Sequence, residues 1–459
     1  VGGGAAMVAG LPQATAQTRP PPPEPTRLKS AGETLRPEIV GDFGIVAAGR
    51  HYAVAAGTRI LMAGGNATDA GVASVFAAAV TEISHFGFGG EAPTIIYDSG
   101  TKDVTVINGQ GTAPALATPD KFAQLGMIPG NGPMGGTIPA MVDAMARALQ
   151  LNGTMTLDQV MQPAIELADG FVMYNFLAEV FVSQQKATAK YKTAYDTYYP
   201  GGALPKVGEI FRQPNLARTM RVIAAADKAA LARTKDRKAA IQAGRDAFYK
   251  GDIARRIGAA MEADGGLMRY GDLAGYQGKV EAPLTADVFG YTVCKGGFWS
   301  QGPALLIALN IAEAAGIGAM EPGSEAYLHT LAESIKLAFD DRNAYFGDPD
   351  FAKVPAKALL SKAYAAQRAT TGDLSALADC LKELERNEAS SQFEELNRRF
   401  HDMLGWASGN PLFGLLTSAL HMLTREFSLS LGYSAQERAV QLRFLRRVLE
   451  AVRKGDAEG

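Results

Sequence analysis

The sequence predicts an α+β protein in which a mixed domain of strands and helices precedes an all-helical bundle. Short β-like runs alternate with helical runs over about residues 38–371, which is typical of a layered domain. Residues 374–459 contain almost no β pattern, and leucines recur there at helical spacing. The change of character near residues 370–373 is therefore the strongest predicted domain boundary.

The first 37 residues are predicted to lie outside both domains. They pass through small and apolar residues to an A-x-A pattern at 14–16 and then through the prolines at 20–23. The A-x-A pattern is typical of a signal-peptide cleavage site, although no charged segment precedes it. Consecutive prolines favour an extended linker. We expect a flexible or signal-like N-terminus, which means a periplasmic or secreted protein if the signal is real and a cytoplasmic protein otherwise.

The mixed domain is predicted to begin with one strand and two helices. The strand lies within residues 44–49, and Gly64–Gly65 ends the first helix. The second helix covers about 68–80 and is very apolar, with small residues that permit close packing on a sheet. Segments 93–98 and 103–109 are predicted to be neighbouring strands joined by a tight turn.

Serine caps define two later helices. Ser324 is predicted to cap a helix that ends at Gly347, and one apolar face of that helix carries Leu328, Leu331, Ile335 and Phe339. In the helical bundle, Asn410–Pro411 begins one helix, and Ser434 with Glu437 forms a capping box for the last. The apolar positions predicted for this last helix are Val440, Phe444, Leu445, Val448, Leu449 and Val452.

The composition excludes several classes of protein. Lys and Arg number 45 against 47 Asp and Glu, so no basic field is present and no nucleic-acid partner is expected. No apolar run reaches the roughly 18 residues of a membrane span. The two cysteines and five histidines show neither CxxC nor HExxH spacing, and no glycine-rich nucleotide-binding motif occurs. We therefore expect no metal ion and no other cofactor.

Nine stretches between residues 49 and 351 form one ordered set, among them FGFGGEAPTIIYD (86–98), TAPALATPDKF (112–122) and WSQGPALLIALNIAE (299–313). Together they resemble the large-subunit region of γ-glutamyltranspeptidases. The resemblance implies a partial N-terminal-nucleophile hydrolase fold, a four-layer αββα sandwich, over about residues 38–371. Members of that family cleave themselves before a Thr, whose freed amine then acts as base for its hydroxyl. The acyl-enzyme passes its γ-glutamyl group to water or to an amino acid.

The first departure from the family pattern concerns the nucleophile. In the family this Thr lies in a Thr–Thr–His stretch that begins a strand of the small subunit. Here Thr370–Thr371–Gly372 is followed by residues that predict helices. A nucleophile at Thr370 or Thr371 would have no small-subunit sheet to support it, so we predict no catalytic residue in this chain. Activity would require a separate small-subunit chain as a partner.

The second departure concerns substrate recognition. Members that bind glutamyl groups carry an Arg before the Ala–Pro pair, and its guanidinium holds the substrate carboxylate as a bidentate pair. In INGQGTAP, Gln110 occupies this position and Gly111 occupies the position of a Glu. Gln110 is therefore the candidate substrate-binding residue, with an ordinary polar loop residue as the alternative. Because Gln110 carries no charge, the pocket could prefer an acyl group other than γ-glutamyl.

Two further clusters have both a functional and a structural interpretation. The backbone amides of the glycines in 87–90, beside Glu91, could face an active site, or they could form ordinary turns. The group 340–342 contains two neighbouring carboxylates and an Arg. Adjacent helical side chains point apart, so a capping or salt-bridge role is the better interpretation of this group.

The helical segment contains the stretches FEELNRRFHDMLGWASGNPLFGLLTSALHMLTREF (393–427) and VLEAVRKGD (448–456). They resemble the ligand-sensing FCD domain of GntR-type transcription regulators, which often binds a metal through one carboxylate or amide and three His. Asn397 and His401 match two ligand positions at i, i+4 spacing. Leu445 stands where a further His is expected, and His421 has no assigned ligand position. We therefore predict that no metal is bound here.

These observations leave three hypotheses for function. The chain is a bacterial glutathione hydrolase-like protein for acyl transfer or amide hydrolysis, acting on a γ-glutamyl or other acyl-amide small molecule, but incomplete and inactive alone. Alternatively, it is a non-catalytic product of a gene fusion, whose exposed strand edges favour a partner. The third hypothesis is a ligand-sensing regulator fragment that dimerises through the helical domain.

Overall fold

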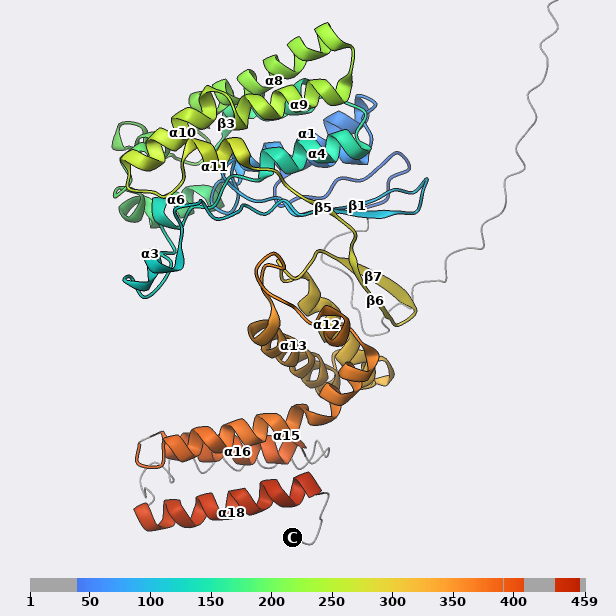
Figure 1. The fold of residues 1–459 in the computed structure, drawn as a ribbon, viewed down its shortest axis with the longest axis vertical. Helices are drawn as coiled ribbons and strands as arrows, with labels where there is room; N and C mark the ends of the chain where they lie inside the picture. Colours follow the sequence, from blue (N-terminus) through green and yellow to red (C-terminus); the bar gives the residue numbers. More distant parts are fainter. Residues whose placement is uncertain (1–38, 391, 408–433, 455–459) are drawn as a thin grey trace, which may run out of the picture. The chain divides into compact units, whose positions relative to one another are not determined.

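The computed structural model describes residues 39–390, 392–407 and 434–454 (Figure 1). The predictions for residues 1–37, for His421 and for the helix after Asn410–Pro411 lie outside these ranges. Within the described residues, helices predominate and short antiparallel strands accompany them. The chain is therefore an α+β protein, as predicted.

The elements follow one another in this order along the chain. The helices are α1 (His51–Met62), α2 (Ala67–Thr81), α3 (Pro119–Ala123), α4 (Met141–Asn152), α5 (Leu157–Asp169), α6 (Asn175–Thr188), α7 (Lys192–Tyr198), α8 (Pro214–Thr234), α9 (Arg237–Tyr249), α10 (Asp252–Ala263), α11 (Tyr270–Gly275), α12 (Gly302–Ala314), α13 (Glu325–Tyr345), α14 (Ala356–Leu359), α15 (Lys362–Arg386), α16 (Phe393–Ala407) and α18 (Ala435–Lys454). The strands are β1 (Thr94–Tyr97), β2 (Val104–Ile107), β3 (Phe171–Val172), β4 (Ile210–Phe211), β5 (Val280–Glu281), β6 (Leu284–Val288) and β7 (Tyr291–Lys295).

The strands form three small antiparallel sheets. β1, β2 and β5 make one sheet in that order, with Thr94 opposite Ile107, and the pairs β3–β4 and β6–β7 make the other two. The predicted strands 93–98 and 103–109 are confirmed as β1 and β2. The turn between them is held by Asp98, whose Oδ1 accepts the backbone N–H of Gly100 over 2.7 Å.

The strand predicted within residues 44–49 does not form. Residues 43–48 make no backbone–backbone hydrogen bond within the described part of the chain. A strand requires a neighbour that pairs with its N–H and C=O groups, and no described segment lies in that position. The local β pattern was therefore insufficient without a partner strand.

Helix α2 forms where the sequence predicted it and packs mainly against α1, α4 and α5. Asn66 and Asp69 form a capping box at its start. The buried carboxylate of Asp69 also accepts the backbone N–H groups of Thr154 and Met155 and the hydroxyl of Thr154. Asp69 thus ties the beginning of α2 to the loop before α5.

Helix α13 begins at the predicted Ser324 cap, whose Oγ accepts the N–H of Tyr327, but its predicted apolar face is wrong. Leu328 is 55% exposed and Phe339 is 41% exposed. The buried face instead carries Ser334, Leu337, Ala338 and Asp341. The two polar side chains of this face can be buried because each forms a hydrogen bond. Ser334 donates to the carbonyl of Thr330, and Asp341 accepts from the hydroxyl of Tyr364 of α15.

Helix α15 runs without interruption through the boundary predicted near residues 370–373. Near its start, Lys362 contacts Asn310 and Glu313 of α12 through its Nζ atom, at 2.8 and 2.5 Å. Near its end, Leu381 and Leu384 enter a separate apolar cluster with α16 and α18. Helix α15 therefore contributes to both the mixed domain and the helical bundle.

The described part of the helical bundle has a core of nine buried side chains, namely Cys380, Leu381, Leu384, Phe393, Leu396, Phe400, Leu442, Leu445 and Leu449. The predicted capping box at Ser434 and Glu437 is confirmed. Val440 and Phe444, which the sequence placed on the apolar face, are 52% and 54% exposed. Leu442, Leu445 and Leu449 form the buried stripe because they recur at three- and four-residue spacing.

Candidate functional site

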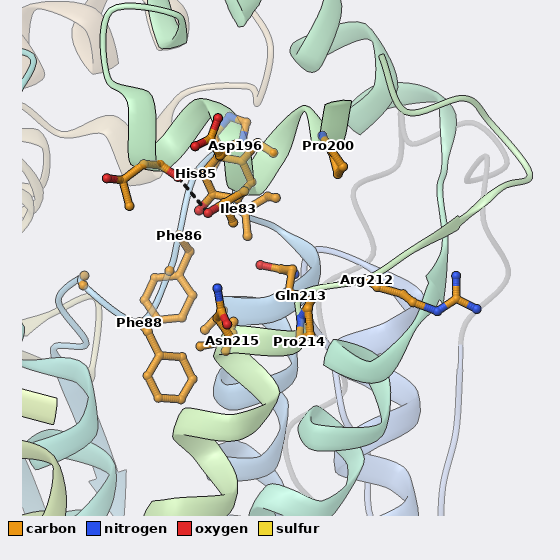
Figure 2. A pocket seen from close by; sticks show the side chains of 18 of the residues that line it. Ile83, His85, Phe86, Phe88, Asp196, Pro200, Arg212, Gln213, Pro214 and Asn215 are labelled. Atoms are coloured by element: carbon orange, nitrogen blue, oxygen red, sulfur yellow. Dashed lines mark hydrogen bonds between the residues drawn. The ribbon is translucent and has the colours of Figure 1, made fainter. Parts of the chain in front are cut away.

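A cavity of about 1060 Å³ lies beside the loop that joins α2 to β1 (Figure 2). The glycine-rich segment 86–91 forms one wall. Residues of α7 and the segment 212–216 at the start of α8 form the opposite side. The predicted glycine cluster therefore borders a cavity, and it joins helix α2 to strand β1.

Backbone hydrogen bonds hold three loops together at one end of the β1–β2 hairpin. The carbonyl of Gly90 accepts the N–H groups of Ala140 and Met141, each over 3.1 Å. Ala92 donates to the carbonyl of Gly109 over 2.9 Å. Because these bonds link segment 86–92 to both neighbouring loops, the cavity wall is fixed to the start of α4 and to the segment that contains Gln110.

Two polar side chains of the cavity form hydrogen bonds with neighbouring groups. Gln213 is buried and donates through Nε2 to the carbonyl of Val80 over 2.7 Å. Asp196 pairs with Lys192 of the same helix at 2.5 Å. Phe86 and Phe88 present their rings on one side, whereas the guanidinium of Arg212 points away from them (Figure 2). This arrangement suits binding through apolar surface and backbone amides. The imidazole of His85 also lines the cavity, and its Nδ1 lies 2.8 Å from the hydroxyl of Ser84, which is outside the lining.

Gln110 lies just after β2 and is half-buried. Its backbone N–H donates to Oδ1 of Asn108 over 3.0 Å, and its carbonyl accepts the hydroxyl of Tyr276 over 2.7 Å. Gln110 is not among the residues that line the cavity. The structure thus brings the loop of Gln110 next to the glycine-rich segment but does not place its side chain in that cavity.

Steric crowding explains why this chain has Gly111 at the position of the family's Glu. A Cβ atom at this position would lie 2.2 Å from the carbonyl oxygen of Ile138 and 2.8 Å from Oγ1 of Thr137. The neighbouring segment is held there because Ile138 donates its N–H to the carbonyl of Thr112 over 3.0 Å. Any side chain at position 111 would therefore push the two loops apart.

A buried ionic network supports the Gln110 loop from behind. Asp143, 1% exposed, accepts from the Nε atoms of Arg147 and Arg245, both at 2.6 Å, and from the N–H of Gly278 at 3.0 Å. Arg245 also donates to the carbonyl of Tyr276. Burial opposes the charge of Arg245, but the carboxylate of Asp143 outweighs it and raises the pKa of this guanidinium. Burial is also the main reason why the pKa of Tyr276 is raised, so its hydroxyl remains a donor.

Sequence reasoning missed Tyr276 and this network. Asp143 and Arg147 lie on α4, Arg245 lies on α9 and Tyr276 follows α11, so no local motif links all four. The i, i+4 spacing of Asp143 and Arg147 was the one available signal, and it predicts only a local helix pair. Arg245 meets Asp143 and Tyr276 because the fold brings α9 next to α4 and to the segment after α11.

The remaining sequence candidates have structural positions. Thr370 and Thr371 lie inside α15 and not at the start of a strand. Asp341 accepts the hydroxyl of Tyr364 over 2.7 Å and lies 3.3 Å from the guanidinium of Arg368, which confirms the salt-bridge interpretation. Burial raises the pKa of Asp341. Cluster 340–342 therefore joins α13 to α15.

In the helical bundle, Gln441 of α18 lies against both predicted ligand positions. Its Nε2 is 3.3 Å from Oδ1 of Asn397 and 3.1 Å from Nε2 of His401. Leu445 is buried in the apolar cluster instead. Among the described residues, no group of three or more His, Cys, Asp or Glu side chains could hold a metal ion. Gln441 is a further residue that the sequence did not identify.

No helix in the described ranges is long and apolar enough to cross a membrane. This finding agrees with the sequence, which contains no extended apolar run.

Comparison with known proteins gives two family matches. The Gamma-glutamyltranspeptidase family profile matches residues 53–396, and the FCD domain profile matches residues 360–459. The chain is 33% identical over 337 residues to the glutathione hydrolase-like YwrD proenzyme of Bacillus subtilis, covering 73% of this chain and 61% of the relative. It is also 33% identical over 370 residues to the glutathione hydrolase proenzyme of the same species, covering 79% and 59%. The chain thus spans about three fifths of the length of the curated relatives it matches.

Solved structures give the same picture. The Helicobacter pylori gamma-glutamyltranspeptidase matches with a TM-score of 0.67 and 29% identity, covering 73% of this chain and 93% of that one. The Pseudomonas nitroreducens gamma-glutamyltranspeptidase matches with a TM-score of 0.62 and 32% identity, covering 72% and 94%. A cephalosporin acylase from Bacillus halodurans matches with a TM-score of 0.61 and 30% identity, covering 69% and 57%.

Proposed function

The chain belongs to the γ-glutamyltranspeptidase family, and we propose that its mixed domain is the non-nucleophilic part of an amide hydrolase or acyl transferase. One observation carries this proposal. The chain covers about three fifths of the curated proenzymes, yet it covers 93% and 94% of two solved γ-glutamyltranspeptidase chains. The matched region therefore has the extent of one polypeptide of those enzymes and not of the whole precursor.

We propose that the chain is inactive alone and becomes active when a separate small-subunit chain supplies the nucleophile. Thr370 and Thr371 lie within α15, so neither begins a strand as the family nucleophile does. A hydroxyl without a base to accept its proton is a poor nucleophile.

We propose that the substrate is a small acyl amide whose recognition does not depend on a charged α-carboxylate clamp. The support is Gln110, which offers hydrogen bonds without a charge at the position of the family's Arg. Acylase names occur among the relatives, as in the ACY 1 proenzyme of Pseudomonas sp. V22 and the cephalosporin acylase of B. halodurans. Relatives with such names support an acyl group other than γ-glutamyl as the substrate of this chain.

The intact mass of the purified chain after incubation at neutral pH tests the nucleophile. We expect one species near 48.4 kDa and no release of p-nitroaniline from a γ-glutamyl anilide. Two fragments, the second beginning at Thr370 or Thr371, would overturn the proposal. So would steady release of p-nitroaniline that Thr370→Ala or Thr371→Ala abolishes.

Activity reconstituted with a small-subunit chain tests the role of Gln110. Gln110→Arg should raise kcat/KM for a γ-glutamyl anilide by about tenfold, because it restores a bidentate carboxylate partner. Gln110→Ala should lower kcat/KM for the preferred uncharged acyl amide. If both variants match the wild-type chain on both substrates, Gln110 is an ordinary loop residue.

A second candidate function is ligand sensing by the helical bundle, including dimerisation through it. The supporting observations are the FCD domain match over residues 360–459 and the contact of Gln441 with Asn397 and His401. This function requires that the mixed domain and the helical bundle are encoded together as one gene product. Genomic DNA read across codons 360–390 would test that requirement, because a frameshift there would show that the two segments do not belong to one gene product.

A further inference from the structure

Ser84 and His85 form a hydroxyl–imidazole pair in the turn that follows α2. The Oγ atom of Ser84 lies 2.8 Å from Nδ1 of His85. The imidazole is stacked on the ring of Phe176, with centroids 5.7 Å apart, and the guanidinium of Arg50 lies 4.6 Å from the centroid of the same Phe176 ring. A hydroxyl within hydrogen-bond reach of an imidazole that a third group orients has the arrangement of an activated nucleophile.

The pair lies between two cavities. Ser84 lines a second cavity of about 410 Å³, whereas His85 lines the cavity of about 1060 Å³ described above (Figure 2). Ile83 and Tyr198 line both, so the two volumes adjoin beside Ser84. Sites for small molecules usually have volumes of roughly 300–1,000 Å³, and the second cavity falls within that range. A substrate bound across the pair would place one part in each cavity.

The lining of the second cavity favours an apolar acyl chain. Leu177, Val180 and Phe181 of α6 line it, and Leu177 and Phe181 are buried. Among the described lining residues there is no carboxylate, and the one charged side chain, Lys190, is exposed. Apolar surface of this kind gains free energy when a hydrocarbon chain displaces water from it. We therefore expect the acyl group in this cavity and the leaving group in the larger one, on the side of His85.

Backbone amides follow the pair directly. The N–H groups of Gly87, Phe88 and Gly89 make no backbone–backbone hydrogen bond within the described part of the chain, and all three residues line the larger cavity. The glycines leave their main chain open to a ligand because they have no Cβ atom. Free backbone donors are the groups that stabilise the negative oxygen of an acyl-transfer intermediate.

We propose that Ser84 and His85 form a catalytic pair that hydrolyses small esters with an uncharged, apolar acyl chain. Oγ of Ser84 attacks the carbonyl carbon of the ester, and Nδ1 of His85 takes the hydroxyl proton. His85 then returns this proton to the leaving alcohol as the C–O bond breaks, which leaves an acyl group on Ser84. Water attacks the acyl carbon and gives a proton to His85, the carboxylic acid is released, and Ser84 regains its proton.

Esters are the expected substrates because an alcohol is a better leaving group than an amine. Among the described residues, no carboxylate is paired with His85, so the imidazolium lacks the partner that an Asp supplies in a Ser–His–Asp triad. The activity requires no small-subunit chain. It is compatible with the proposed inability of the chain alone to cleave amides, and it would correct the expectation that the chain contains no catalytic residue.

Hydrolysis of p-nitrophenyl butyrate by the purified full chain tests the pair. Ser84→Ala and His85→Gln should each lower kcat/KM at least about a hundredfold. Ser183→Ala is the matched control, because the hydroxyl of Ser183 also makes a local hydrogen bond, to the carbonyl of Val180, and Ser183 lines neither cavity. An alkyl fluorophosphonate should label the wild-type chain at Ser84, as read by peptide mass, and should label neither Ser84→Ala nor His85→Gln there.

Val180→Trp tests the place of the acyl group. The indole would fill part of the second cavity, so the ratio of the rates on p-nitrophenyl butyrate and p-nitrophenyl acetate should fall by about tenfold. Val182→Trp is the matched control, because Val182 lies on the same helix, is 61% exposed and is outside the lining.

The proposal is overturned if the wild-type chain hydrolyses neither ester faster than free imidazole at the same concentration, or if no label forms on Ser84. A rate that survives Ser84→Ala but not His85→Gln would show catalysis by an exposed imidazole alone, and it would also overturn the proposal. Equal rate ratios for Val180→Trp and Val182→Trp would remove the acyl group from the second cavity. The test of the proposed function uses a second chain and a γ-glutamyl anilide, so either idea can fail without the other.

Discussion

The hydroxyl of Tyr276 donates a 2.7 Å hydrogen bond to the backbone carbonyl of Gln110, 166 positions earlier in the chain. Tyr276 is itself held by Arg245, whose guanidinium donates to the Tyr276 carbonyl and pairs with the buried Asp143. The substrate-binding candidate is therefore positioned through its main chain by residues that do not border the cavity. Both hydrogen bonds described for Gln110 run through its main chain, one to Asn108 and one to Tyr276.

Tyr276→Phe should loosen the Gln110 loop without disturbing the core. The ring of Tyr276 is 4% exposed and would remain packed, whereas the hydrogen bond to Gln110 would be lost. The expected cost is about 1 kcal/mol of unfolding free energy, measured by urea denaturation. Amides of residues 108–112 should exchange faster than in the wild-type chain. Unchanged exchange in that segment would show that the other two loops fix it without Tyr276.

Gly111→Ala should be strongly destabilising, although it adds only one methyl group. That methyl would lie 2.2 Å from the carbonyl oxygen of Ile138, a backbone atom that cannot rotate away. We expect a loss of at least about 2 kcal/mol and a lower thermal midpoint. Gly130→Ala is the matched control, because a Cβ there meets nothing within 4 Å. Equal melting temperatures for the two variants would contradict the close approach of the loops.

Asp227 should make stability fall as the pH rises. It is fully buried on α8; one oxygen accepts the N–H of Asp158 over 3.1 Å and the other has no described partner. Burial raises the pKa of Asp227, so the folded state holds this proton more tightly than the unfolded state does. The stabilisation is complete below the unfolded pKa of about 3.9 and is lost as the pH rises through the higher folded value.

Asp227→Asn should therefore gain stability relative to the wild-type chain at neutral pH, and the gain should shrink as the pH approaches 4. The amide keeps an acceptor for Asp158 and removes a desolvated charge. Urea denaturation at several pH values measures this, with the exposed Asp103→Asn as control. A variant that is less stable than the wild-type chain at every pH would show that the carboxylate is needed as a charged cap for α5.

Stoichiometric Zn²⁺ should leave the melting temperature of the chain unchanged. Asn397 and His401 face the amide of Gln441, which carries no charge, and Leu445 is buried among apolar side chains. Zinc prefers several thiolate, imidazole or carboxylate ligands. Thermal unfolding with and without the metal measures this. A stabilisation of several degrees would show that a ligand set had been overlooked.

Local signals in the sequence predicted local structure well. The β1–β2 hairpin, the bounds of α2 and the caps at Ser324 and Ser434 all depend on residues close together in the chain. The strand at 44–49 and the buried face of α13 were predicted wrongly because their outcome depends on distant partners. The first lacks a paired neighbour among the described residues, and the second buries Asp341, which accepts a hydrogen bond from Tyr364 of α15.

The candidate site was predicted less completely than the fold. The glycine-rich segment was identified as a possible wall because glycine permits close backbone approach, and the structure places it at a cavity. The relation between Gln110 and Tyr276 could not be predicted, because a side chain that bonds to a backbone carbonyl leaves no motif. The same holds for Gln441, whose partners lie on another helix.

Helix α15 also makes the chain sensitive to small changes of length. Arg368 near its start contacts the carbonyl of Leu337, and Leu381 further along enters the bundle core. Each inserted helical residue adds a rotation of about 100° and a rise of 1.5 Å. One extra codon between these two residues would change the direction in which the bundle leaves the helix, whereas seven would nearly restore it. Length variants at this point are therefore expected to be tolerated in steps of about two turns.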